Sequence, residues 1–550
     1  MLGNHDSRHR RATHHDTGYA LLTWPCLPPS PTVIPGRKMT TAKTRAYIIV
    51  ATSVGVSAAA IWSREVSQAI YYSVVTLAAG VGALILYRLS PFHPLYNFPG
   101  PILLRVSEIP MLYYALKGTR HVFVKRLHDQ YGRVVQTGPN TLSFLSLSAI
   151  TRIYGSSNAL DKTTAYDVHS MNEEGLFFIK DKATHARRRR IWNRAFSEEA
   201  LSQYHGPLVT EIQNLIRTLL QRTRDHGDVD LVRIFPQYTY DTTNTLFFSG
   251  NAWHPSLLDK DDREQIVDEA STFFKTSECL GHIEPLFHVV NLIPNLTNFL
   301  RLEVISREAA SRRLKNGPSF KDGMSYWLEG DGVNMPLEDL GIEAESVLIG
   351  ASDTVAAAST FLMCFLMAHE KWLVLLRDEL DETFEEAVIH RLNSLDKLVV
   401  LNAVIQETLR LGTPMPGFPR VVPDQGILLD GKYIPSGSVV NVPIWAHHVD
   451  EEMFADATTF DPSRWIEDGK FVAKTTLLAF GAGPFNCVGS KLAYLQLRAL
   501  TAMLLLNLEF IPTAGFDEVK FRDGVRNTRA TSFVEPLRVR VVPRTPVVAV

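Results

Sequence analysis

The chain has 550 residues, 45% of them hydrophobic, and its 56 Lys and Arg nearly balance its 58 Asp and Glu. The net charge of −2 gives no global attraction for nucleic acid, so no nucleic-acid partner is expected. Four scattered cysteines without a CxxC pair exclude a disulfide framework and a zinc finger, and predict reduced thiols in a cytosol-facing body.

Residues 1–45 are rich in His, Arg, Thr and Pro and lack apolar periodicity. They predict a flexible N-terminal tail, or sequence upstream of a start at Met39. Two uncharged apolar stretches follow, at 46–62 and 70–87, each near the lower length limit for crossing a thin bilayer. Residues 46–88 are therefore predicted to be a membrane anchor.

The charges that flank the anchor predict its orientation, because basic residues stay on the cytosolic side of a membrane. Two spans would form a hairpin with both ends in the cytosol. A single span at 70–87 would place the tail in the lumen and still leave the body in the cytosol. We expect the endoplasmic reticulum membrane, with the body of the chain facing the cytosol.

Residues 90–101 hold four prolines, so 89–101 are predicted to be a stiff hinge. The body, 102–545, begins with short β-like runs, continues as long helices over 195–410, and is broken by Gly and Pro over 412–445. Strand signals recur there in "GILLDGKYIP" and "GSVVNVPIWA". The predicted fold class is mainly α with small β-sheets (α+β).

Four consecutive arginines lie in "HARRRRIWNRAF", 185–196. Such a run can be a nucleic-acid patch or a localisation signal, and it can equally be solvated surface charge. Further on, Asp353 and Thr354 interrupt the apolar helix expected over 345–369. Burying a carboxylate is costly. Either Asp353 pairs structurally while Thr354 bonds to its own helix, or the two residues have a chemical role.

The segment "ETLR", Glu407 to Arg410, places opposite charges on one helix face. ExxR is expected by chance in a chain of this length, and a second copy, "EPLR", lies at 535–538. The later segment "FDPSRW" adds a further arginine, Arg464.

The segment "FGAGPFNCVGSKLA", 480–493, surrounds one cysteine with glycines and opens a strongly helical stretch. Glycines let a loop bend around a sulfur, and a helix N-terminus favours a thiolate. Cys487 is thus a candidate metal ligand. The alternative is a buried structural cysteine in a glycine-rich turn.

This loop resembles the haem-binding loop of the cytochrome P450 superfamily, and the other motifs occur in the order of that family over about 91–545. The resemblance implies the cytochrome P450 fold and haem b with the Cys487 thiolate as axial iron ligand. The residues that would form the cofactor-binding loop are Phe480, Gly481, Phe485, Cys487 and Gly489.

The resemblance also assigns roles outside the loop. It places His185, Arg189 and Arg420 on the haem propionates, and Glu407, Arg410 and Arg464 in a structural cluster. Asp353 and Thr354 would relay protons to bound oxygen. Phe485 departs from the family, which usually carries Arg or His there. Either the other three residues suffice for the propionates, or a basic residue from elsewhere fills the gap.

The implied function is monooxygenation: one atom of O2 enters an apolar small molecule. Electrons would come from NADPH-cytochrome P450 reductase, with cytochrome b5 as a further candidate, and membrane lipid would be the other partner. The segments "HPLYNFPGP" and "GPNTLSF" look like those of fungal members, which predicts secondary metabolism and a terpenoid substrate. The alternatives are a haem-thiolate isomerase or dehydratase acting on peroxides, and a non-catalytic membrane haem- or ligand-binding protein.

Overall fold

The computed structural model describes eleven stretches of the chain, all within the unit that spans Lys38–Val550. They are residues 66–155, 159–166, 175–253, 255–260, 266–270, 272, 299–332, 335–384, 392–415, 417–528 and 530–544. The predicted tail at 1–45 and the first apolar stretch at 46–62 lie outside the described residues. Their predictions stay open.

The second apolar stretch forms helix α2 (Val66–Leu89), which extends a few residues beyond the predicted 70–87. It has the length and hydropathy of a membrane-crossing helix, and very little of it is buried by the protein. Residues 90–98 form successive turns rather than helix, as four prolines in 90–101 predict. The Arg88 side chain donates a hydrogen bond to the Val106 carbonyl, which connects the end of α2 to the body.

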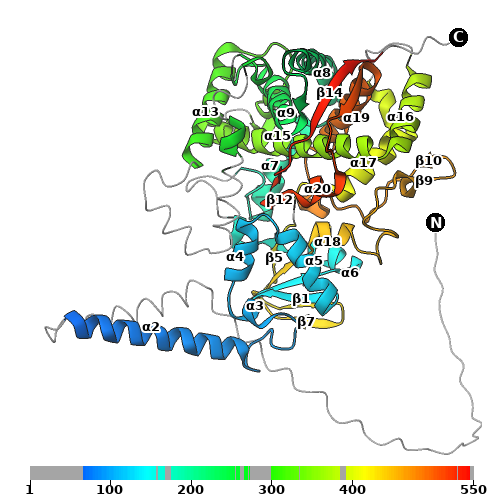
Figure 1. The fold of residues 1–550 in the computed structure, drawn as a ribbon. Helices are drawn as coiled ribbons and strands as arrows, with labels where there is room; N and C mark the ends of the chain where they lie inside the picture. Colours follow the sequence, from blue (N-terminus) through cyan, green and yellow to red (C-terminus); the bar gives the residue numbers. More distant parts are fainter. Residues whose placement is uncertain are drawn as a thin grey trace, which may run out of the picture. The chain divides into compact units, whose positions relative to one another are not determined.

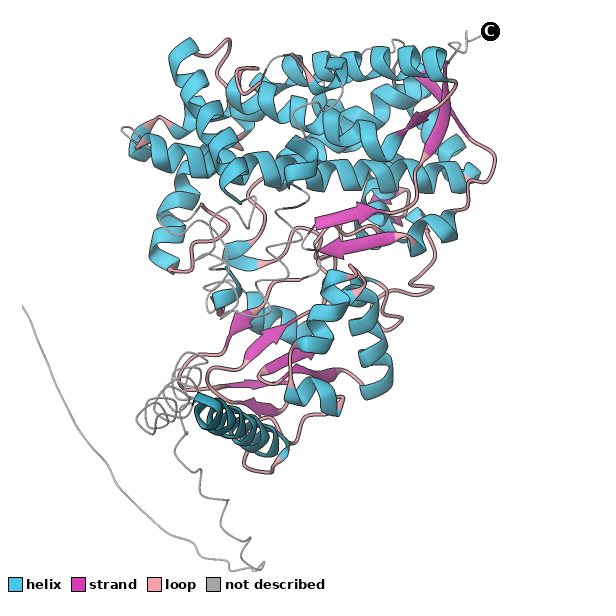
Figure 2. Ribbon diagram, turned by 60° about the vertical axis from the view of Figure 1, so that its left-hand side comes forward, coloured by secondary structure: helices cyan, strands magenta, loops and turns pink. Residues whose placement is uncertain are grey.

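Helices make up most of the body (Figures 1 and 2). Those of the first part are α3 (Ile102–Val106), α4 (Ile109–Leu116), α5 (Arg120–Tyr131), α6 (Leu147–Tyr154), α7 (Lys182–Ala195), α8 (Glu198–His226), α9 (Leu231–Phe248) and α10 (Leu257–Lys260). Those that follow are α13 (Phe299–Asn316), α14 (Gly323–Trp327), α15 (Leu337–Ala368), α16 (Glu370–Thr383), α17 (Val399–Leu411), α18 (Ile444–His448), α19 (Ser490–Asn507) and α20 (Glu518–Asp523).

The longest described helix, α15, is the centre of the helical part. It packs against α9, α13, α17 and α19, and most of its side chains are buried in the main hydrophobic cluster. Its apolar sequence would also suit a membrane span. Because 78% of its most apolar window is buried by other helices, α15 is a core helix of the body.

A five-stranded sheet has the order β1-β2-β8-β5-β3, in which only the β2–β8 pair is parallel. Its strands are β1 (Val134–Gly138), β2 (Thr141–Phe144), β3 (Asp161–Lys162), β5 (Arg420–Val421) and β8 (Val439–Asn441). In the β3–β5 pair, Lys162 lies opposite Arg420. The sheet therefore brings residues from the early and late parts of the chain together.

The remaining strands form small sheets. They are β4 (Val229–Asp230) with β11 (Leu508–Pro512) and β14 (Arg538–Pro543), and the hairpins β6 (Ile427–Leu429)–β7 (Lys432–Ile434), β9 (Ile466–Glu467)–β10 (Lys470–Phe471) and β12 (Val525–Thr528)–β13 (Ala530–Phe533). The predicted mainly helical fold with small sheets is confirmed. Within "GSVVNVPIWA" the strand is Val439–Asn441, and helix α18 begins at Ile444 after Pro443.

Candidate functional site

The loop 480–489 folds tightly before α19. Gly481 and Gly483 have φ angles of +67° and +68°, in the left-handed region that favours glycine. A Cβ on Gly483 would lie 1.7 Å from the Tyr154 carbonyl oxygen, so this position requires glycine. The Cys487 N–H donates to the Phe480 carbonyl at 2.8 Å, and Gly489 caps α19. Cys487 thus lies two residues before the helix cap, close to the predicted position.

The Cys487 thiol is exposed, although protein surrounds it, which indicates that it faces an internal space. Burial raises the pKa of this thiol, opposed by the Gly489 N–H and the Arg189 charge. The other described cysteine, Cys364, is fully buried in α15, and burial raises the pKa of its thiol strongly. Of these two cysteines, only Cys487 is accessible to a ligand.

The predicted basic residues gather around this loop. Arg189 on α7 donates to the Asn486 side-chain oxygen at 2.8 Å and to the Asn486 carbonyl, so it braces the residue next to Cys487. Arg420 on β5 is buried and donates to the Tyr166 hydroxyl at 2.9 Å. The Nε atom of Arg420 is buried and has no hydrogen-bond partner in the described part of the chain.

His185 is buried one helical turn before Arg189, and its ring meets the Phe485 ring edge-on at a centroid distance of 4.6 Å. Burial, together with the nearby charges of Lys162, Arg189 and Arg420, lowers the pKa of His185 to about 3. His185 is therefore neutral at physiological pH and can offer a hydrogen bond but no positive charge.

Lys162 was missed by the sequence reasoning. It is buried on β3, where its Nζ donates to the carbonyls of Phe177 at 2.7 Å and Ile179 at 2.9 Å. The same Nζ lies 4.8 Å from the centroid of the Phe485 ring. A lysine in a two-residue strand has no motif around it, so only the β3–β5 pairing could have drawn attention to it.

These residues suit a ligand that has two carboxylates and a metal needing a sulfur donor. Several cations are gathered in the interior beside the cysteine loop, and a buried positive charge is costly unless an anion compensates it. The buried Nε of Arg420, without a partner among the described residues, is a donor available to such an anion. Haem b, with an iron and two propionates, fits this donor set.

The two residues predicted to relay protons, Asp353 and Thr354, lie on α15. An added Cβ at Gly350 would meet nothing within 4 Å, so open space adjoins this residue. Thr354 donates from Oγ1 to the Gly350 carbonyl at 2.7 Å, and Tyr240 on α9 donates to Asp353 Oδ2 at 3.2 Å. Burial raises the pKa of Asp353 to about 7, and the Tyr240 hydrogen bond opposes this shift. In the described part of the chain, no hydrogen bond or ion pair joins this pair to the cysteine loop.

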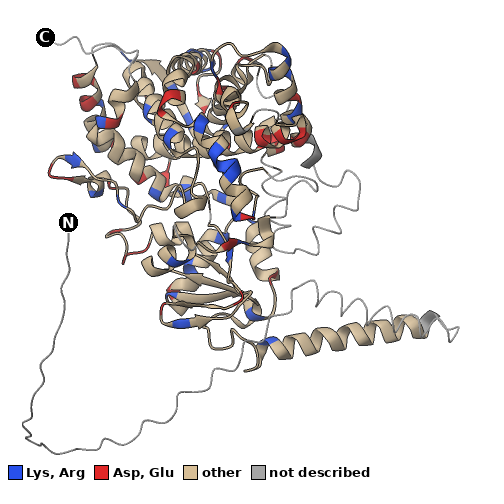
Figure 3. Ribbon diagram, turned by 180° about the vertical axis from the view of Figure 1, so that it is seen from behind, with Lys and Arg blue, Asp and Glu red and all other residues tan. Residues whose placement is uncertain are grey.

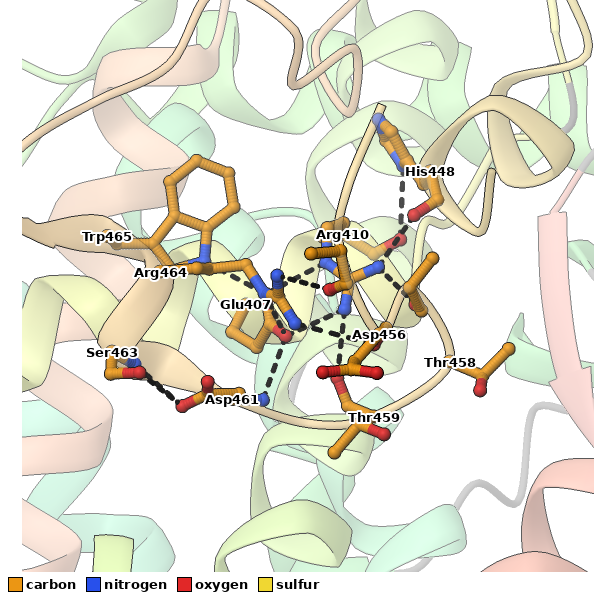
Figure 4. Close-up of polar contacts among 12 residues, drawn as sticks. Glu407, Arg410, His448, Asp456, Thr458, Thr459, Asp461, Ser463, Arg464 and Trp465 are labelled. Atoms are coloured by element: carbon orange, nitrogen blue, oxygen red, sulfur yellow. Dashed lines mark hydrogen bonds and ion pairs between the residues drawn. The ribbon is translucent and has the colours of Figure 1, made fainter. Parts of the chain in front are cut away.

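The predicted charged cluster is present and buried (Figure 4). Glu407 accepts from Arg410 Nε at 2.8 Å and Nη2 at 2.7 Å, from Arg464 Nε at 2.9 Å, and from Trp465 Nε1 at 2.9 Å. The other donors of Arg410 go to backbone carbonyls of His448, Ala457 and Thr459. Every charge is thus hydrogen-bonded, as a buried cluster requires.

The second ExxR copy forms no such pair. Glu535 is bonded to Lys520 at 2.9 Å, while Arg538 is bonded to Asp228 at 2.7 Å, and both pairs lie at the surface. The two copies look alike in the sequence. Their different surroundings show that burial, and not the spacing, makes Glu407–Arg410 a structural cluster.

A cavity of about 240 Å³ lies beside the basic residues. It is lined by residues from α5, β1, β2 and β8 and by Tyr166, Phe177, Met415, Phe418 and Pro419. Residues of 166–180 and 412–419 contribute to it, whereas the described residues of 345–354 and 526–533 do not line it.

The fold and the site together define a haem-thiolate protein: a helical body with small sheets, an accessible cysteine before a long helix, and buried cations beside it. The cytochrome P450 family model matches residues 98–528. The chain belongs to the cytochrome P450 family, and its cofactor is haem b held by a cysteine thiolate.

Among similar proteins, the cytochrome P450 monooxygenase astD of Aspergillus oryzae is 32% identical, over 77% of this chain and 85% of its own length. Trichothecene C-15 hydroxylase of Fusarium sporotrichioides is 27% identical over 86% and 99%. The solved cytochrome P450DA haem domain has the same fold, with a TM-score of 0.68 at 17% identity, covering 82% of this chain and 98% of that one. The chain is therefore a cytochrome P450 monooxygenase of fungal type.

Proposed function

We propose that the chain hydroxylates, or oxidises in a related way, an apolar small molecule of fungal secondary metabolism, with Cys487 as the thiolate ligand. When bound, the haem activates dioxygen so that one oxygen atom can enter the substrate. The observation that carries the assignment is the accessible Cys487 thiol between the Gly489 N–H and Arg189. Sulfur binds a metal as thiolate, and these neighbours favour that form.

The residues on the loop side hold the carboxylates of the cofactor. Arg420 offers charge and a buried donor from β5, and His185 offers a neutral N–H from α7. Arg189 acts mainly on the loop itself, since two of its nitrogens go to Asn486. The three residues predicted to bind the propionates therefore have different roles. Arg420 and His185 bind the carboxylates, whereas Arg189 braces Asn486 beside Cys487.

Asp353 and Thr354 handle protons on the other side. A carboxyl with a pKa of about 7 can both hold and release a proton near neutral pH, which is what a general acid–base group requires. Tyr240 positions Asp353 by its hydrogen bond. The Thr354 hydroxyl donates to the Gly350 carbonyl, so its oxygen can accept a hydrogen bond from the open space beside Gly350.

Membrane attachment is supported by an apolar surface that continues from α2 into the body. On α4, Ile109, Tyr113 and Leu116 lie at i, i+4 and i+7 and are all exposed, which places them on one helix face. Ile102 and Leu103 on α3 are also exposed. We infer that this face rests on the bilayer that α2 enters, and that the membrane is the endoplasmic reticulum with the body on its cytosolic side.

The electron donor we propose is NADPH-cytochrome P450 reductase, with cytochrome b5 as a further candidate. Helix α7 carries the arginine run (Figure 3). Arg187 and Arg190 are exposed on it, whereas Arg188 pairs with Asp339 and Glu343 on α15. An exposed basic patch near the cysteine loop suits an acidic protein partner.

The comparisons support the reaction class more strongly than the substrate. Relatives of nearly equal similarity are named for different substrates: tryprostatin B for a 6-hydroxylase of Aspergillus fumigatus that is 28% identical, and a trichothecene for the C-15 hydroxylase. Sequence identity of 27–28% to these enzymes therefore does not identify the substrate of this chain. We propose a terpenoid as the substrate class, with other apolar metabolites as further candidates.

The experiment is turnover of the full chain with reductase and NADPH under ¹⁸O2, over a panel of terpenoids and other apolar metabolites. The proposal expects products that gain one labelled oxygen and require NADPH. Reaction with lipid peroxides alone, without reductase, would indicate an isomerase or dehydratase instead. Haem binding without any turnover on either panel would indicate a ligand-binding protein.

A further inference from the structure

Lys162 and Arg420 are two buried cations at directly opposite positions of the antiparallel β3–β5 pair. Side chains at such positions are neighbours, and like charges there are destabilising. The Lys162 ammonium is anchored by the carbonyls of Phe177 and Ile179, which fixes where its charge lies. Holding these two positive charges together in the interior therefore costs folding free energy.

Both cations meet at Phe485. The Lys162 Nζ lies 4.8 Å from the centroid of this ring, and the Arg420 guanidinium carbon lies 5.2 Å from it. The His185 ring contacts the same ring edge-on. A benzene ring attracts cations through its negative face. Phe485 therefore holds two basic side chains in the place where a basic side chain at position 485 would itself lie.

We propose that Lys162 replaces the missing basic residue of the cysteine loop: it binds a haem propionate together with Arg420, while Phe485 holds the two cations against its ring. The inference rests on the proposed function, with haem bound at Cys487. The Arg420 Nε, which is buried without a partner among the described residues, supports an anion at this place. Burial is the largest cause of the low pKa of His185, and the charges of Lys162, Arg189 and Arg420 lower it further.

The test is the rate at which the holoprotein loses haem to an excess of apomyoglobin. Lys162→Met keeps a long apolar side chain and removes the charge. A charge-assisted hydrogen bond lost from the cofactor should accelerate haem loss about tenfold. The matched control is Lys182→Met, because Lys182 lies near β3 but is exposed and pairs with Asp161 at 2.8 Å. The control should stay within about twofold of the wild type.

A second variant separates propionate binding from a structural role. Phe485→Arg supplies the basic residue from the loop, so Lys162→Met in that background should change haem loss by less than about threefold. The reduction potential gives a further readout: it should fall in Lys162→Met, because a cation that favours the reduced iron is lost, and recover in the double variant.

Two results would overturn the inference. The first is haem loss from Lys162→Met at the wild-type rate. The second is haem loss from the double variant that is as fast as from Lys162→Met. Lys162 would then act only as a structural contact to Phe177 and Ile179. If the single variant cannot be isolated with haem, the comparison between Phe485→Arg and the double variant decides alone. A wild type that holds no haem would instead refute the proposed function.

Discussion

At the scale of one residue, Asp353, for which we propose a role in proton transfer, is a carboxyl whose burial should lower the stability of the folded protein at neutral pH. Its carboxyl sits in the interior of the body with one hydrogen bond, from Tyr240. Burial raises its pKa to about 7. A folded-state pKa above the ordinary value means that the folded protein keeps a proton that the unfolded chain releases. The folded state therefore loses stability as the pH rises through this interval.

We predict that Asp353→Asn raises the thermal midpoint relative to the wild type, by an increment that grows between pH 4 and pH 7. The wild type loses up to about 1.4 kcal/mol per pH unit from this group, and an amide loses nothing. Glu343 and Glu345 have pKa values raised by burial to about 7 and about 8, but they are common to both proteins, so the difference isolates Asp353.

The same variant should turn over substrate more slowly while its haem spectrum is unchanged, because proton delivery is lost and cofactor binding is not. Scanning calorimetry across the pH range checks the stability increment. An increment that stays constant from pH 4 to pH 7 would mean that Asp353 ionises normally in the folded protein.

Where a motif fixed both the identity and the spacing of residues, the sequence predicted which residues lie close together. Cys487, Arg420 and His185 were predicted on that basis, and the structure places them around one loop. Lys162 was not predicted, because its contact with Phe485 joins positions more than 300 residues apart through a two-residue strand. The sequence showed that the family's usual basic residue is absent at 485 but contained no signal for the replacement that we propose.

At the scale of elements, the Glu407 cluster connects α17 to the segment that precedes the cysteine loop. Arg464 and Trp465 belong to a 3₁₀ turn at Pro462–Trp465, and both bond to Glu407. The Arg410 guanidinium also holds three backbone carbonyls between His448 and Thr459. The cluster thus fixes how the late loops are attached to the helical core.

Glu407→Gln is expected to destabilise the fold by about 3–5 kcal/mol, because it leaves the fully buried Arg410 and the partly buried Arg464 without their carboxylate. Glu535→Gln is the matched control, since it changes the same residue type in the other ExxR copy. Its pair with Lys520 lies at the surface, so a cost below about 1 kcal/mol is expected. The effect of each variant is measured by the yield of haem-bound protein and by its thermal midpoint. Equal destabilisation by the two variants would show that burial does not cause the difference between the two ExxR copies.

Element boundaries were predicted well where one signal dominated. The apolar run at 345–369 gave the C-terminal three quarters of α15, and α2 matched the second apolar stretch. In "GSVVNVPIWA" the strand covers only Val439–Asn441, and α18 begins at Ile444 directly after Pro443. Pairing across the sheet, which periodicity does not reveal, decides where such a short strand stops.

At the scale of the whole molecule, the apolar face of α3 and α4 makes the membrane contact testable. Leu116 is 63% exposed in the protein, and Val519 on α20 is 65% exposed, so water should reach both equally. In lipid nanodiscs, hydroxyl-radical labelling of the full chain should fall several-fold at Leu116 relative to Val519, because lipid excludes water from an apolar face. Equal labelling would leave α2 as the sole contact proposed from the described residues.

The fold class and the enzyme class followed from the sequence, because the family's motifs are short, ordered and chemically specific. The substrate did not follow. The cavity beside the basic residues is lined by side chains from at least four elements, and its shape depends on packing that no local pattern encodes. The similar proteins do not identify the substrate either, since enzymes of nearly equal sequence identity to this chain are named for different substrates.

The most direct test of the central claim is the spectrum of the full-length protein reduced under carbon monoxide. A cysteine thiolate on the iron predicts the long-wavelength Soret band that gives the cytochrome P450 family its name. Cys487→Ala should abolish that band, whereas Cys364→Ala, which changes a cysteine buried in α15, should retain it. A Cys487→Ala protein that keeps the band would contradict the assignment of Cys487 as the iron ligand.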